Sequence, residues 1–137
     1  MKKERCFMDE GLKKQSFEWF ERGDRHISTA KMLLENQWYA DTITFHIQQA
    51  IEMYIKGFLI LHDNKPQKIH DLDILLSQAT RYDERLNTFL ELCEKATKYY
   101  LENRYPPGPL VQYSYSEIKN DMEKAYQLIQ MIRNIIG

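Results

Sequence analysis

The sequence has few residues that form turns. It contains five glycines and four prolines in 137 residues, roughly half of the usual combined share of about 12%. Four of these nine residues lie together at positions 106–109. Sandwiches and barrels need a turn signal about every 8–12 residues, so the composition argues against them. It predicts a few long helices with one irregular joint.

The chain also lacks the features of exported and membrane proteins. Its two cysteines, Cys6 and Cys93, are too few for a disulfide framework. Residues 1–15 are rich in charge and lack the apolar core of a signal peptide. The longest apolar runs, such as residues 58–61, are far too short to cross a bilayer. We therefore expect a cytoplasmic protein with reduced thiols and no membrane contact.

An excess of positive charge is missing as well. The chain has 19 basic and 20 acidic residues, a net charge of −1, and an isoelectric point of about 6.4. Proteins that bind nucleic acid through a broad basic face usually have a high isoelectric point. Any contact with a nucleotide or RNA would therefore be local, or shared with a partner.

Apolar residues recur at helical spacing along most of the chain. The predicted helices span residues 16–36, 39–61, 71–81, 83–102 and 116–136. Ser16 and Ser116 stand where N-caps are expected, and the second helix is apolar around enough of its circumference to be central. We predict an all-α fold, an up-and-down antiparallel bundle of four to five helices. It occupies residues 16–137 and follows a polar extension, residues 1–15.

Two features of these helices leave alternatives open. Gly23 lies inside the first helix, which indicates either close approach of a neighbouring helix or a local bend. The last helix carries apolar residues at alternating spacings of four and three, which is typical of a bundle core and also of a dimer seam. The residues of this seam are Ile118, Met122, Ala125, Ile129, Ile132 and Ile136.

Common catalytic and cofactor motifs are absent. The sequence has no Walker loop, no glycine-rich dinucleotide fingerprint and no Gly-x-Ser-x-Gly elbow. No two of its four histidines are four residues apart, and helix capping is a simpler role than metal binding for residues 62–63 and 70–73. Cys93 is expected to be a small buried apolar residue. We predict no metal site, no cofactor and no catalytic residue.

Three segments resemble the HEPN domain family. Residues 45–52, Phe-His-Ile-Gln-Gln-Ala-Ile-Glu, with Lys56 after them, are similar to the family's His-x-Gln-Gln-Ala-x-Glu-Lys-x-x-Lys helix. Residues 70–72, His-Asp-Leu, resemble its Thr-His-Asp-Leu segment, and residues 104–106, Arg-Tyr-Pro, resemble the tripeptide before its last long helix. The resemblance covers residues 17–136, with departures at Met53, where the family often has Lys, and at Ile69, where it has Thr.

One further departure concerns activity. Many HEPN ribonucleases carry an arginine followed, four to six residues later, by a histidine near the last helix. Here Arg104 is followed by no histidine, because His70 is the last one in the chain. Metal-free RNA cleavage needs an acid or base as well as a cation, so cleavage by the family's usual route is not expected.

The resemblance therefore implies a nucleotide- or RNA-associated binding module. Such domains are usually homodimers and often act beside a small, co-encoded nucleotidyltransferase, in a substrate-binding or toxin–antitoxin-like role. Two alternatives remain: a residual metal-independent ribonuclease that uses Arg104 with a tyrosine hydroxyl or His70, and a dimeric interaction scaffold without a small ligand.

Six residues are candidates for contact with a nucleotide or phosphate. Arg104 precedes the proline-rich joint, where its guanidinium could clamp a phosphate, and Tyr105 could stack on a base. Alternatively, Arg104 caps the fourth helix and Tyr105 packs in the core.

The other four candidates lie on the second helix and at the start of the third. His46, Gln49 and Lys56 are spaced by three and seven residues, so they share one face of the second helix. Glu52 continues the same row. Such polar residues either line a cleft or form buried hydrogen bonds, and the second reading is favoured. His70 stands at the start of the third helix, where a capping role is the simpler one.

Overall fold

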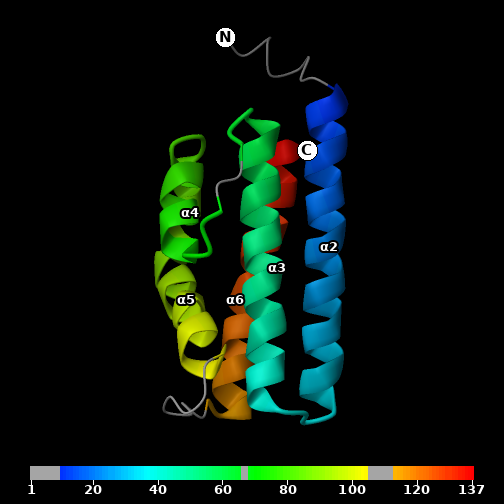
Figure 1. Cartoon of the computed structure of the whole chain (residues 1–137), viewed down its shortest axis with the longest axis vertical. Helices are drawn as coiled ribbons and strands as arrows, with labels where there is room; N and C mark the ends of the chain where they lie inside the picture. Colours follow the sequence, from blue (N-terminus) through cyan, green and yellow to red (C-terminus); the bar gives the residue numbers. More distant parts are fainter. Residues whose placement is uncertain (1–9, 66–67, 105–112) are drawn as a thin grey trace.

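The chain is an all-α, up-and-down antiparallel bundle. The computed structural model describes residues 10–65, 68–104 and 113–137, with the backbone alone for residues 100–104. The elements are α2 (Glu10–Glu35), α3 (Ala40–Leu61), α4 (Leu72–Thr80), the 3₁₀ helix η1 (Glu84–Phe89), α5 (Leu90–Arg104) and α6 (Tyr115–Ile136). In Figure 1, α2 runs down and α3 up, the short helix α4 also runs up, α5 runs down, and α6 runs up again, so that the four long helices alternate in direction. The predicted fold class is confirmed.

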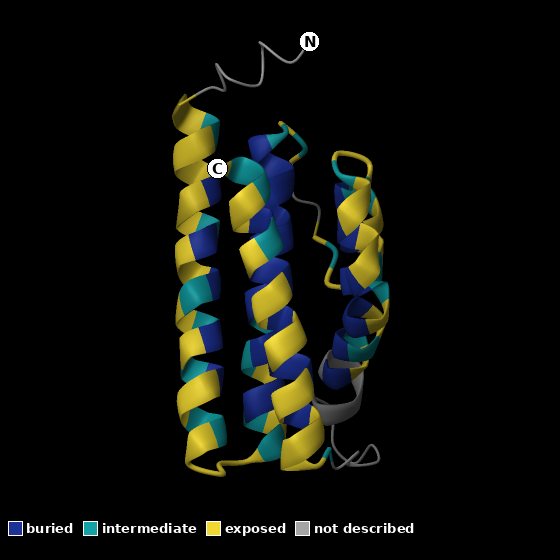
Figure 2. Cartoon of the chain, turned by 180° about the vertical axis from the view of Figure 1, so that it is seen from behind, coloured by how far each residue is buried: buried dark blue, intermediate teal, exposed yellow. Residues whose placement is uncertain are grey.

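Helix α3 is the centre of the bundle, as the sequence predicts. It contacts α2, α4, α5 and α6, and 15 of its 22 residues are buried. Its bounds agree with the predicted range to within one residue. Seen from behind in Figure 2, the buried residues of each helix face the interior, and the outward faces are exposed.

The start of the first helix differs from the prediction. Helix α2 begins at Glu10, six residues before the expected N-cap at Ser16. Ser16 lies inside the helix and is fully buried, because it packs where α2 meets Gly57 of α3. The prediction of Ser16 as an N-cap is therefore wrong, and the expected division between residues 15 and 16 falls inside α2.

The last helix also starts earlier than predicted. Its N-cap is Ser114, whose hydroxyl accepts a hydrogen bond of 3.1 Å from the backbone N–H of Glu117. Ser116 is the second residue of the helix, so its assignment as the start is wrong. Ser114 and Glu117 have the Ser-x-x-Glu spacing of a capping box, in which the serine satisfies the otherwise unpaired N–H of the third helical residue.

The predicted fourth helix is divided into two elements. Residues 84–89 form the 3₁₀ helix η1, and α5 follows from Leu90. Asp83 caps η1: its carboxylate accepts hydrogen bonds from the backbone and the guanidinium of Arg85, at 3.0 and 2.6 Å. Because 3₁₀ and α-helices bury residues at similar spacings, the apolar pattern alone does not distinguish them.

Two glycines allow α2 and α3 to approach closely. A Cβ atom on Gly23 would lie 2.5 Å from Cδ2 of Tyr54, and one on Gly57 would lie 2.6 Å from Cε1 of Phe20. The two rings stack on each other with centroids 4.9 Å apart. Of the two alternatives for Gly23, close helix approach is therefore the one observed.

The apolar seam of α6 is part of the chain's own core. Five of its six residues are buried, Ile118 and Ile132 completely, and Ile136 packs against the same cluster. The bundle-core alternative is therefore the one observed for the five buried positions, and Ile136 remains partly exposed. Cys93 is also fully buried, as predicted, and burial raises the pKa of its thiol to about 12. None of the helices in the described ranges is long and apolar enough to span a membrane.

Candidate functional site

Three of the six predicted site residues belong to one hydrogen-bonded network, and a fourth, His46, lies on the same helix and contacts His26. His46, Gln49 and Lys56 lie on α3, and His70 lies in the segment that leads into α4. Figure 1 shows α3 in front, between α2 on one side and α4 and α5 on the other. We call these residues, together with the side chains that join them, the polar cluster. Its members are His26, His46, Gln48, Gln49, Glu52, Lys56 and His70.

The carboxylate of Glu52 is the centre of the polar cluster. Glu52 is only 3% exposed, and a buried carboxylate is stable only with partners. Gln48 Nε2 donates to its Oε1 at 3.0 Å, and Lys56 Nζ donates to its Oε2 at 2.9 Å. His70 Nδ1 lies 3.3 and 3.4 Å from the two oxygens. Three side chains from two segments thus converge on one anion.

Lys56 is engaged within the fold. Its side chain is 6% exposed, and it forms an ion pair with Glu52 one turn earlier on α3. Its ammonium group also lies 5.9 Å from the ring centre of Trp19 on α2. The positive charge of Lys56 is therefore neutralised inside the bundle and does not face the solvent.

Gln49 connects the buried part of the cluster to its surface. Its Nε2 donates to Gln48 Oε1 at 2.8 Å, and Gln48 in turn donates to Glu52. Gln49 is half-buried, whereas Gln48 is fully buried. The row on α3 thus forms the buried hydrogen bonds that the sequence favours, and its outer members remain accessible.

His70 faces Glu52 from the segment that leads into α4, and its side chain is half exposed. Two residues further on, the backbone N–H of Leu72 donates to the hydroxyl of Thr97 on α5 at 2.9 Å. Asp71 stands at the N-cap of α4, as expected, but its side chain makes no capping hydrogen bond. Thr97 therefore takes over part of the capping role.

The sequence did not identify His26 as a site residue. His26 lies on α2, and its Nδ1 is 3.0 Å from Nδ1 of His46 on α3. Burial lowers the pKa of both histidines below the ordinary value of 6.5. The charge of His46 lowers the pKa of His26 further, and Glu52 opposes these effects. Because α2 and α3 are joined by a short turn, residues at similar distances from the turn face each other. That relation is the signal that pairs His26 with His46.

A comparison with models of protein families shows which family the chain belongs to. The model of the HEPN domain matches residues 17–137. The chain belongs to the HEPN domain family. Searches among curated proteins and among solved structures gave no match. A HEPN domain is an all-α, nucleotide- or RNA-related module, and the family resemblance of residues 17–136 is confirmed.

The Arg-Tyr-Pro segment that resembles the HEPN family begins at the end of α5. Arg104 is the last residue of this helix, and no histidine follows it in the sequence. The side chain of Arg104 and the whole of Tyr105 lie outside the described residues, so their predicted roles remain predictions. Of these two candidates, the structure therefore places only the backbone of Arg104.

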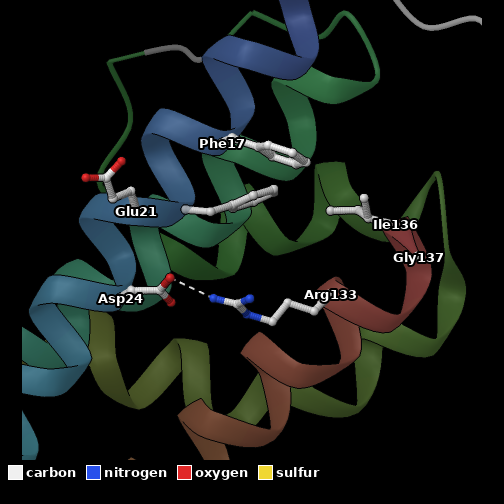
Figure 3. A pocket seen from close by; sticks show the side chains of 7 residues that line it. Phe17, Glu21, Asp24, Arg133, Ile136 and Gly137 are labelled. Atoms are coloured by element: carbon white, nitrogen blue, oxygen red, sulfur yellow. Dashed lines mark hydrogen bonds and ion pairs between the residues drawn. The ribbon is translucent and has the colours of Figure 1, made fainter.

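A hollow of the HEPN bundle, away from the polar cluster, lies between α2 and α6. It has a volume of about 340 Å³, and Figure 3 shows Phe17, Glu21, Asp24, Arg133 and Ile136 around it. Arg133 Nη2 donates to Asp24 Oδ2 at 2.6 Å, and none of the predicted site residues lines the hollow. Since the guanidinium is already paired, this hollow is a weaker candidate for an anionic ligand than the open side of the polar cluster.

Proposed function

We propose that this HEPN domain is a nucleotide- or RNA-binding module that acts without nuclease chemistry of its own. The observation that carries the proposal is the network that joins Gln49, Lys56 and His70 through Gln48 and the buried Glu52, so that partly exposed hydrogen-bonding groups are held from inside the bundle. His46, which contacts His26, lies on the same helix. In this role the domain serves as a substrate-binding or toxin–antitoxin-like partner of a small nucleotidyltransferase in the cytoplasm.

Binding is favoured over cleavage by the charges of the cluster. Cleavage of a phosphodiester needs a cation at the developing negative charge, and Lys56 is neutralised by Glu52. The histidine expected after Arg104 is also absent from the sequence. What the cluster offers instead are imidazole and amide groups, which hold a ligand through hydrogen bonds.

Calorimetry tests the binding. We expect the purified protein to bind AMP or ATP, and His70→Ala to weaken the binding about tenfold, because a half-exposed donor of the cluster is lost. His62→Ala is a matched control, since His62 stacks on Tyr82 outside the cluster and its removal leaves the affinity unchanged. A folded wild-type protein that binds neither nucleotide nor RNA contradicts the proposal.

The partner is tested separately. A nucleotidyltransferase encoded beside this gene should be retained by the tagged HEPN domain in a pull-down. Sedimentation should show a homodimer, which is the usual state in the family. Because the seam of α6 is buried in the chain's own core, the dimer has to form through another surface. A monomer that retains the transferase would remove the dimer from the proposal and leave the partnership intact.

One contact favours a second candidate function, residual metal-independent ribonuclease activity. His70 Nδ1 faces the buried carboxylate of Glu52, an arrangement that orients an imidazole as an acid or base. Purified protein would then cut single-stranded RNA in the presence of a chelator, and His70→Asn and Arg104→Ala would each abolish the cutting. Intact RNA at high enzyme concentration rejects this candidate.

A further inference from the structure

The contact between His26 and His46 fixes the proton content of both rings. Their Nδ1 atoms are 3.0 Å apart, which is the length of an N–H···N hydrogen bond. Two protons would clash in this space and two lone pairs would repel. One Nδ1 atom therefore carries a proton and donates a hydrogen bond, which the other Nδ1 atom accepts. The neutral pair then has one protonated and one unprotonated Nε2 atom.

Both Nε2 atoms are accessible. Neither has a hydrogen-bond partner among the described residues, where Nδ1 is the only bonded ring nitrogen of each histidine. Within the same part of the chain, Ser16 Oγ is the one buried side-chain nitrogen or oxygen without a partner. The Nε2 atoms of these half-buried rings are therefore open to solvent and can meet a ligand.

An unpaired arginine stands beside the pair. Arg22 precedes His26 by four residues, so the two share one face of α2. It is exposed, and among the described residues it forms no ion pair. Arg25, the next arginine on this helix, differs because it pairs with Glu21 at 2.6 Å. Arg22 is thus an exposed cation one helical turn from His26.

The charges around the two rings are few. Glu52 on α3 is the one acid that acts on His26, and it is already neutralised by Lys56. On α3, the neighbours of His46 at one turn, Thr42 and Gln49, are uncharged. An additional proton on the pair would therefore add a positive charge that Glu52 offsets only in part, because burial lowers the pKa of His26 more than Glu52 raises it.

We propose that Arg22, His26 and His46 form a phosphate-binding site that takes up a proton when the phosphate binds. With one ring fully protonated, the Nδ1 hydrogen bond persists, both Nε2 atoms become donors, and the pair carries one positive charge. A phosphate oxygen stabilises that charge and raises the affinity of the pair for the additional proton. The site supplies the free cation that Lys56 does not, and the inference rests on the proposed nucleotide-binding function.

Binding should then depend on pH in a defined direction. Protonation of the pair is disfavoured in the free protein, because burial lowers both pKa values. Phosphate affinity is therefore expected to increase as the pH falls, by about tenfold per pH unit at most, since the linkage involves one proton. A dinucleotide with a single phosphodiester is the suitable probe, because its own charge does not change between about pH 5.5 and pH 8.

Calorimetry in buffers of different ionisation enthalpy measures the protons directly. The wild-type protein should take up as much as about one proton for each dinucleotide bound. The double variant His26→Asn/His46→Asn keeps polar groups at the helix contact but cannot be protonated, so its binding should involve no proton uptake and no dependence on pH. Arg22→Gln should lower the affinity about tenfold at every pH and leave the proton uptake in place. The matched control, Arg25→Gln, should change neither.

The outcomes separate the inference from the function on which it rests. If the wild-type protein binds the dinucleotide and the double asparagine variant shows the same proton uptake, the inference is overturned and nucleotide binding stands. If the folded wild-type protein binds no dinucleotide or mononucleotide at any pH, the proposed function fails as well. Circular dichroism of each variant confirms that loss of binding is not loss of fold.

Discussion

Glu52 and Lys56 form a buried ion pair one turn apart on α3, with a distance of 2.9 Å and side chains only 4% and 6% exposed. A buried pair contributes little to stability compared with apolar residues, but the loss of one partner leaves an uncompensated charge in the interior. Because Gln48 and His70 also converge on Glu52, the carboxylate holds three side chains of the polar cluster.

Loss of either partner should destabilise the protein strongly. We expect Glu52→Gln and Lys56→Met each to lower the free energy of unfolding in urea by about 3–5 kcal/mol. The double variant should lose clearly less than the sum, because no charge is then left unpaired. Glu21→Gln, which breaks the exposed pair with Arg25, should cost no more than about 0.5 kcal/mol. Additive losses at the buried pair would contradict this account.

The glycines between α2 and α3 should not tolerate a methyl group. Gly23→Ala and Gly57→Ala place a Cβ atom 2.5 and 2.6 Å from stacked aromatic rings that cannot move independently. Overpacking should cost about 1–3 kcal/mol, more than the gain in helix propensity of about 1 kcal/mol. Thermal unfolding measures the change. Ser28→Ala, at an exposed position of α2, is the control, and a stabilising Gly23→Ala would refute the close approach.

The two serines near the start of α6 should behave differently. Ser114→Ala removes the hydroxyl that accepts from the N–H of Glu117 and should lower the free energy of unfolding by about 1 kcal/mol. Ser116→Ala, at an exposed position inside the helix, should be neutral to slightly stabilising. Chemical denaturation of both variants compares them, and the opposite order would restore Ser116 as the start of the helix.

The histidine pair should make stability depend on pH. Because the folded-state pKa values of His26 and His46 lie below the unfolded value of 6.5, the unfolded chain binds more protons in that interval. The free energy of unfolding is therefore unaffected by the pair above about pH 6.5, and it decreases as the pH falls through 6.5 toward the lowered folded-state pKa values. In the double asparagine variant, the slope of unfolding free energy against pH should flatten in this window. An unchanged slope would show that other groups cause it.

The sequence predicted the elements of the fold that depend on long apolar periodicity. Helix α3 was located to within one residue, and α6 and its seam were identified because their spacing is regular over several turns. The errors lie at helix ends. Ser16 has the side chain of an N-cap but is buried inside α2, and of two serines two residues apart only Ser114 has an acid at the third position after it.

The sequence predicted the candidate site as a row of residues on one helix. It did not predict the hydrogen-bonded network between helices. The spacing of His46, Gln49 and Lys56 places them on one face, which requires only the geometry of a single helix. The neutralisation of Lys56 by Glu52 depends on how α3 is buried. The contact between His26 and His46 depends on which residues of α2 face α3. Such contacts between elements are not encoded in local spacing. The role assigned to Arg104 remains a prediction.

Thr97 links two helices through one hydroxyl group. It donates to the carbonyl of Cys93 within α5 at 2.8 Å and accepts the N–H of Leu72 at the start of α4. The start of α4 is therefore tied to α5 by a hydrogen bond that lies two residues after His70. Since α5 ends at Arg104, about two turns after Thr97, one hydroxyl stands between the end of α5 and the segment that presents His70 to Glu52.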